Sequence, residues 1–124
     1  MREAVGGTQP VGPYSAGIIA EGRFVYVSGQ GSLKDGEIIS GTIEEETRLT
    51  LENLGRVLEQ AGASFDDVVR VGIFLADLTE FEPMNAVYES FFAVPRPART
   101  TVGAALMGIK VEIDCVARLP RTAD

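Results

Sequence analysis

The chain has 124 residues, 45% hydrophobic and 23% charged, which suits one globular domain spanning residues 1–124. Its 18 acidic and 11 basic side chains give a net charge of −7, which argues against unspecific binding to nucleic acid or an anionic membrane. Histidine is absent, which excludes Ser-His-Asp and Cys-His nucleophiles and histidine-based zinc sites, so we expect no metal centre.

The cysteine content and the N-terminal residues predict a cytoplasmic protein. Cys115 is the only cysteine in the sequence, so no internal disulfide can form. Its alternation with apolar neighbours indicates a buried, inert thiol. The first residues lack the apolar segment of a signal peptide, and no apolar run reaches the length of a membrane span.

The N-terminal third predicts a loop followed by a β-hairpin. Residues 8–15 are rich in proline and glycine and read as a loop that carries Tyr14. The short apolar run at 16–20 and the β-branched, aromatic run at 23–28 are joined by Glu21-Gly22, which is typical of a two-residue hairpin turn.

The middle of the chain predicts a long helix and a central strand. Thr42 and Glu45 have capping-box spacing, and Gly62 is suited to the position just after the helix. Residues 68–75 are apolar on both faces, which is typical of a strand covered on both sides.

The last third predicts a second helix and two strands. Thr79 and Glu82 repeat the capping-box spacing and are expected to start the helix, whose apolar stripe includes Asn85. A strand should run over 100–105 and another over 110–118, where apolar and charged residues alternate.

Together these elements predict an α+β fold, a mixed β-sheet with two α-helices packed on one face. The other face of the sheet is still partly apolar and has no cover within the chain. Copies of the same chain, packed with this face inward, would supply one.

Arg99 is the strongest single candidate for ligand chemistry. Pro95 and Pro97 give it a stiff, extended approach at the start of a strand. A guanidinium is a planar, permanently charged fork that suits a carboxylate or a phosphate. The alternative is a surface cation paired with a carboxylate, and the sequence leaves both open.

Other candidates have an ordinary structural interpretation beside the functional one. The sequence favours Glu112 as a solvated or cross-strand-paired side chain over one that orients a water in a cleft between subunits. Tyr14 is either a lid over a ligand or a packing aromatic. Asn85 is favoured as a core amide over a support of the site, and Ser28-Gly29 either presents backbone groups to a ligand or ends a strand.

Several short motifs are distributed along almost the whole chain. They are Gly12-Pro13-Tyr14-Ser15, Val27-Ser28-Gly29-Gln30, Glu45-Glu46-Thr47 leading to Leu51-Glu52-Asn53-Leu54, Phe74-Leu75-Ala76-Asp77-Leu78, Asn85-Ala86-Val87-Tyr88, Pro97-Ala98-Arg99-Thr100-Thr101-Val102 and Val111-Glu112-Ile113. In this order and spacing they resemble the RidA/YjgF family of reactive-intermediate (imine/enamine) deaminases. The resemblance extends from about residue 10 to residue 117, and its most specific part is Pro-Ala-Arg-Thr followed by a Val-Glu-Ile strand.

The resemblance implies a chorismate-mutase-like fold and a homotrimer with clefts between subunits. It implies hydrolysis of 2-aminoacrylate and 2-iminopropanoate to pyruvate and ammonia, without a metal or organic cofactor. By position, the catalytic residues would be Arg99, which binds the substrate carboxylate, and Glu112, which activates water. The substrate-binding positions would be Tyr14, Ser28, Gly29, Asn85 and Thr101.

Three positions depart from the family pattern. Thr101 stands where many members have cysteine, and Ala16 and Gly31 replace residues frequent at the expected cleft rim. These departures bear on substrate identity more than on the Arg99 clamp. Two alternatives stay open: a noncatalytic trimer that binds small carboxylic acids, and a ribonuclease, which the acidic charge and the missing histidines disfavour.

Overall fold

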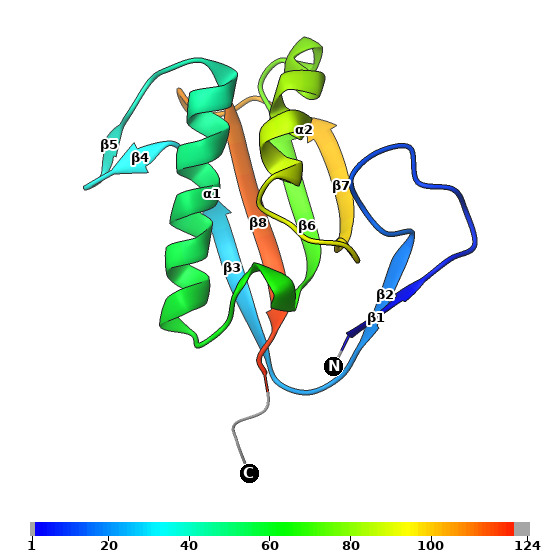
Figure 1. Cartoon of the computed structure of the whole chain (residues 1–124). Coiled ribbons are helices and arrows are strands. Elements are labelled where there is room, and N and C mark those ends of the chain that lie inside the picture. Colours follow the sequence, from blue (N-terminus) through cyan, green and yellow to red (C-terminus); the bar gives the residue numbers. More distant parts are fainter. Residues whose placement is uncertain (1, 121–124) are drawn as a thin grey trace.

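The computed structural model describes residues 2–120, and its centre is a four-stranded mixed sheet in the order β3-β8-β6-β7 (Figure 1). The strands are β3 (Phe24–Gln30), β8 (Val111–Arg118), β6 (Val68–Leu75) and β7 (Ala98–Gly103). β8 pairs antiparallel with β3 and β6, whereas β6 and β7 are parallel. The parallel pair requires a crossover, which contains the second helix.

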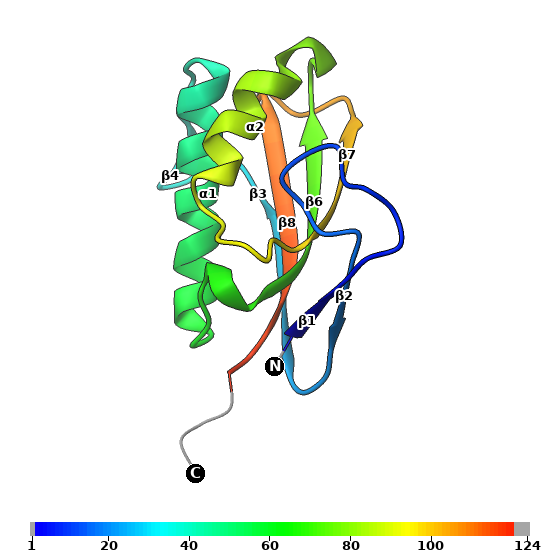
Figure 2. The same ribbon diagram turned by 45° about the vertical axis from the view of Figure 1, so that its right-hand side comes forward.

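Two helices cover one face of this sheet, α1 (Ile43–Gln60) and α2 (Phe81–Glu89) (Figures 1 and 2). Their apolar stripes pack on alternate residues of β6 and β8, which fixes the face of each strand. This arrangement confirms the predicted α+β class. The fully buried core includes Leu51, Leu54, Leu58, Met84, Tyr88, Val71, Ile73 and Ile113.

The predicted ends of α1 are confirmed. The Thr42 hydroxyl accepts the N–H of Glu45 at 3.1 Å, and the Glu45 carboxylate accepts the N–H of Thr42 at 2.8 Å. Gly62, just beyond the helix, has a φ of +83°, where a side chain would be strained.

A buried carboxylate connects the first turn of α1 to the start of β8. Glu46 accepts the backbone N–H of Lys110 at 2.9 Å and that of Gly41 at 3.2 Å. The Lys110 ammonium lies 3.4 Å from the same carboxylate. Three donors around one buried acid hold the β7–β8 connection against the helix layer.

The predicted hairpin between residues 16–20 and 23–28 is wrong. β2 (Gly17–Ala20) instead pairs antiparallel with β1 (Arg2–Val5). The Arg2 guanidinium donates to the carbonyls of Asp66 (2.6 Å) and Pro95 (2.7 Å), so β1 is anchored near the start of β6. These contacts distant in sequence outweigh the turn signal at Glu21-Gly22.

The predicted capping box of α2 is also wrong. The Asp77 carboxylate accepts the Thr79 hydroxyl at 2.7 Å and the Thr79 N–H at 2.9 Å, which caps a 3₁₀ turn over Leu78–Glu80. These hydrogen bonds hold the pKa of Asp77 below its ordinary value. The helix then begins at Phe81 without a side-chain cap.

Two smaller expectations have different outcomes. β7 begins at Ala98, two residues before the predicted start, because Ala98 already pairs with Arg70 of β6. Lys34-Asp35-Gly36-Glu37 has the composition of a turn, and the structure forms a short hairpin there from β4 (Leu33–Lys34) and β5 (Glu37–Ile38).

The face of the sheet opposite the helices has no cover within the described residues. Tyr26 of β3 is 75% exposed there and Val102 of β7 is 42% exposed. Phe74 of β6, expected to be covered on both sides, is half-buried on this face. Its cover by copies of the chain stays a prediction. Within residues 2–120, no helix has the length and apolar character that a membrane span requires.

Candidate functional site

Arg99 lies near the start of β7 and reaches towards α2. It pairs in register with Val71, whose side chain belongs to the core, so Arg99 is on the side of the sheet that the helices cover. Its Nη1 donates to Oδ1 of Asn85 at 2.7 Å. The helix residue thus supports the arginine directly, as the family resemblance implies.

Three aromatic rings surround the Arg99 guanidinium. Its Cζ is 4.9 Å from the ring centroid of Tyr88 and 5.7 Å from those of Tyr14 and Phe81. Burial lowers the pKa of Arg99, but an arginine starts so high that it stays protonated. Among the residues that the structure describes, the one ion pair joins Glu46 and Lys110, so the alternative of a carboxylate-paired Arg99 is wrong.

A small pocket of ≈240 Å³ opens beside this guanidinium. Thr101, two residues further along β7, has a buried hydroxyl without a hydrogen-bond partner within residues 2–120. The pocket therefore offers a cation and a free hydroxyl between apolar walls. Its lining consists of Val11, Gly12, Tyr14, Phe81, Arg99 and Thr101.

The loop that carries Tyr14 is attached to the approach of β7. The Ser15 N–H donates to the Pro97 carbonyl at 3.1 Å, and the Ser15 hydroxyl donates to the carbonyl of Arg96. The Tyr14 hydroxyl accepts the N–H of Val11 at 3.3 Å. The loop is thereby folded so that the Tyr14 ring forms one wall of the pocket.

Glu112 belongs to the opposite face of the sheet. It alternates with Val111 and Ile113, which are fully buried under the helices, so its side chain points away from them. A β-bulge between Val27 and Gln30 places Gly29 against it. A Cβ on Gly29 would lie 2.1 Å from Oε2 of Glu112, so a side chain at position 29 would displace this carboxylate.

The predicted site residues therefore form two separate groups within one chain. Arg99, Tyr14, Asn85 and Thr101 make the first group, which we call the clamp. Glu112 and Gly29 make the second group, and Ser28 is exposed next to Gly29. The sheet separates the two groups, so one chain alone does not bring Arg99 and Glu112 together.

Two aromatic neighbours of the clamp, Phe81 and Tyr88, are not among the site residues predicted from the sequence. The pattern of the second helix identifies them only as part of its apolar stripe. With Asn85 they have the spacing i, i+4 and i+7, which places all three on one face of α2. A polar amide between two aromatics at this spacing was the available signal.

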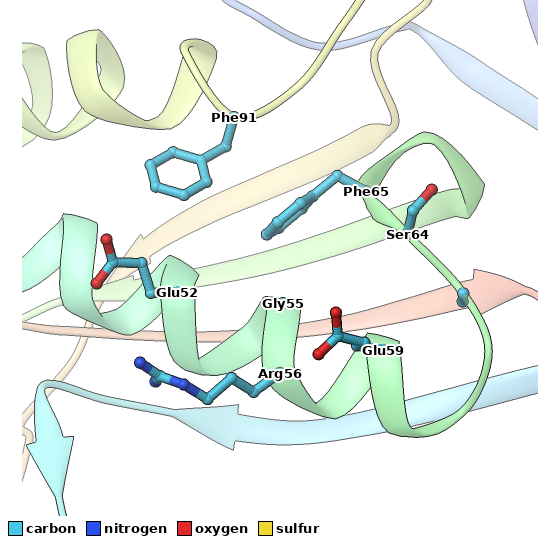
Figure 3. A pocket seen from close by; sticks show the side chains of 8 residues that line it. Glu52, Gly55, Arg56, Glu59, Ser64, Phe65 and Phe91 are labelled. Carbon is cyan, nitrogen blue, oxygen red and sulfur yellow. The ribbon is translucent and has the colours of Figure 1, made fainter.

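A second hollow, of ≈390 Å³, lies on the outer side of α1 (Figure 3). The rings of Phe65 and Phe91 meet edge to face there at 5.6 Å, with Glu52 and Glu59 on the helix beside them. None of the predicted site residues lines it, and the clamp remains the candidate site.

Comparison with known proteins identifies the family of the chain. The family model described as Endoribonuclease L-PSP matches residues 6–119. The chain is 46% identical over 111 residues to "Protein mmf2, mitochondrial" of Schizosaccharomyces pombe, covering 86% of this chain and 87% of that protein. It is 36% identical over 111 residues to the human 2-iminobutanoate/2-iminopropanoate deaminase, covering 86% and 80% respectively.

A solved structure of RidA from an Antarctic Psychrobacter has the same fold, with a TM-score of 0.73 and 31% identity. The match covers 90% of this chain and 92% of that one. It supports the chorismate-mutase-like architecture. The mitochondrial relative leaves the cytoplasmic location a prediction. With nearly its whole length matched, the chain belongs to the Endoribonuclease L-PSP family, which includes the RidA/YjgF proteins that its motifs resemble.

Proposed function

We propose that this protein hydrolyses small 2-imino and 2-enamino acids, such as 2-iminopropanoate and 2-aminoacrylate, to the 2-oxo acid and ammonia. The observation that carries the proposal is the guanidinium of Arg99, which lines a small pocket without a carboxylate partner in the described residues. A planar carboxylate is the ligand that such a fork fits best. The similarity to a human protein named for this reaction supports the same assignment.

We propose further that the active site forms between copies of the chain in a homotrimer. The clamp and the Glu112 group lie on opposite sides of one sheet, so a neighbouring copy has to supply the second group. The exposed apolar residues on the helix-free face, Tyr26 and Val102, give the copies a surface to bury.

In this arrangement Arg99 binds the substrate carboxylate and places the imine carbon next to a water held by Glu112 of the adjacent copy. The starting species is the iminium, which 2-aminoacrylate reaches by taking a proton from solvent at C3. Glu112 accepts a proton as the water oxygen bonds to C2, and the π pair of the C=N bond moves to nitrogen. Glu112 then returns its proton to the nitrogen of the carbinolamine, and the C–N bond breaks as ammonia leaves. The hydroxyl oxygen forms the C=O bond, and its proton passes to Glu112. An iminium carbon is already electrophilic, so positioning supplies much of the acceleration.

The test is the decay of 2-aminoacrylate generated in situ by a β-eliminating enzyme. We expect Arg99→Ala to lower kcat/KM by about 30- to 150-fold, the equivalent of losing a charge-assisted pair of about 2–3 kcal/mol. Arg99→Lys keeps the charge but not the fork and should retain only part of the activity. An Arg99→Ala protein that hydrolyses the imine as fast as the parent would refute the assignment.

One observation favours a second candidate function, a small-carboxylate binder without catalysis. The clamp is complete within one chain, whereas Glu112 is on the other face. Pyruvate binding that depends on Arg99, together with no imine turnover by the assembled protein, would favour this candidate.

A further inference from the structure

Tyr88 is the deepest of the three aromatic residues around the clamp. Its side chain is fully buried, and its ring centroid is the nearest of the three to Cζ of Arg99, at 4.9 Å. The same ring packs against Phe92 of the core, with centroids 4.5 Å apart and an interplanar angle of 30°. The ring therefore contacts both the core and the guanidinium.

The Tyr88 hydroxyl does not explain the position of this residue. It is buried and has no hydrogen-bond partner among residues 2–120, which makes it a cost to folding. Burial also raises the pKa of this phenol, so the ring stays neutral at ordinary pH. What the residue contributes is the aromatic face that it turns to Arg99.

Asn85 and Tyr88 act on the same guanidinium from one face of α2. Asn85 accepts a hydrogen bond from Nη1, while the Tyr88 ring lies within cation–π distance of Cζ. Nη2 lies on the pocket side, where a Cβ added to Gly12 would be 3.8 Å from it. One edge of the guanidinium is thus fixed by the helix and the other is left for a ligand.

We propose that Tyr88 is a positioning residue: its ring holds the Arg99 guanidinium so that the free edge faces the pocket. The ligand that this edge receives rests on the proposed function, a small 2-imino or 2-oxo acid. Preorganising a flexible arginine lowers the cost of ordering it on binding. The effect should therefore be seen in carboxylate affinity and KM more than in kcat.

The experiment compares Tyr88→Met with Tyr88→Phe and with the control Phe92→Met. Tyr88→Met fills the space without a ring and should raise the Kd for pyruvate and the KM for the imine about tenfold. Tyr88→Phe keeps the ring, so it should bind pyruvate within about twofold of the parent and be no less stable. Phe92→Met disturbs the same aromatic stack without removing the ring that faces Arg99, and should leave Kd unchanged.

A readout without ligand separates this inference from the proposed function. In the free protein, the ring current of Tyr88 should shift the side-chain NMR resonances of Arg99. The contribution of the Tyr88 ring should persist in Tyr88→Phe. In Tyr88→Met, or in Tyr88→Leu if the methionine variant does not fold, only the contributions of Tyr14 and Phe81 should remain. This result would support the inference even if the parent proved unable to hydrolyse imines.

Three outcomes would overturn the inference. One is a ringless variant whose Arg99 resonances match those of the parent. The second is a ringless variant that binds pyruvate as tightly as the parent. The third is an equal loss of affinity in Phe92→Met, because the effect would then come from the core as a whole.

Discussion

The separation of Arg99 from Glu112 by the sheet predicts that two inactive variants restore activity when their subunits are mixed. Arg99→Ala keeps the Glu112 group, and Glu112→Ala keeps the clamp. In the proposed trimer each site takes Arg99 from one copy and Glu112 from the next. A site between an Arg99→Ala copy and a Glu112→Ala copy can therefore be intact.

The fraction of complete sites in the mixture determines how much activity should return. In an equal, random mixture, the copy that supplies the clamp carries an intact Arg99 in half of the sites. The copy that supplies the carboxylate carries an intact Glu112 in half of the sites. About one quarter of all sites should then be complete, so about one quarter of the parental activity should return.

The assay refolds the two variants together from urea, confirms the oligomeric state by light scattering, and measures imine hydrolysis. The control mixes Arg99→Ala with the double variant Arg99→Ala, Glu112→Ala, which contains no intact clamp and should restore nothing. If mixed oligomers form and the single-variant mixture stays as inactive as the control, Arg99 and Glu112 do not act across subunits and the proposed site is wrong.

Three further predictions concern stability, the Tyr14 loop and the thiol. Glu46→Ala should lower the free energy of unfolding by about 1–3 kcal/mol in urea titrations, because it leaves two partly buried backbone N–H groups without an acceptor. Lys110→Ala removes a side chain that is 41% exposed and should cost less than about 1 kcal/mol, so equal losses would contradict this account. Ser15→Ala removes the hydrogen bond from the Ser15 hydroxyl to the Arg96 carbonyl. It should raise the Kd for pyruvate about fivefold, while the free energy of unfolding changes by less than about 1 kcal/mol. An unchanged Kd would argue against a role of this bond in holding the pocket wall. Burial raises the pKa of Cys115 to about 12, so little thiolate forms at pH 8. Iodoacetamide should therefore modify the native protein far more slowly than the urea-unfolded chain. Equal rates would show that the thiol is accessible.

The sequence predicted those parts of the fold that neighbouring residues determine. The capping box of Thr42 and Glu45 and the glycine at position 62 act within a turn or two, and both ends of α1 were placed correctly. Alternation along residues 110–118 likewise predicted that Glu112 points away from the core.

The errors arose where two partners compete. Residues 17–20 can pair with a strand on either side, and the contacts of Arg2 with Asp66 and Pro95 decide the choice, from positions far away in sequence. At the start of α2, Asp77 and Thr79 are both good capping residues. The aspartate forms the cap, and the chain makes a 3₁₀ turn first.

The sequence identified the key residue of the candidate site but not the side chains that surround it. Arg99 was singled out because a histidine-free sequence offers few other groups for ligand chemistry. The helical period of α2 showed which of its residues share a face. It could not show that the guanidinium of Arg99, from a strand, would lie against Phe81 and Tyr88 on that face. Only the register of β7 against β6 places it there.

The division of the site has a consequence for how activity depends on assembly. A separate chain holds a complete clamp, so we expect it to bind a small carboxylic acid. Glu112, which would activate water, lies on the far side of the same sheet. In the proposed trimer, the contact that covers the apolar face also brings Glu112 to the clamp of the next copy. Substitution of Tyr26 by a charged residue on the helix-free face should then abolish hydrolysis while leaving Arg99, its aromatic neighbours and pyruvate binding largely intact. Loss of both properties together would mean that the clamp itself requires the neighbouring copy.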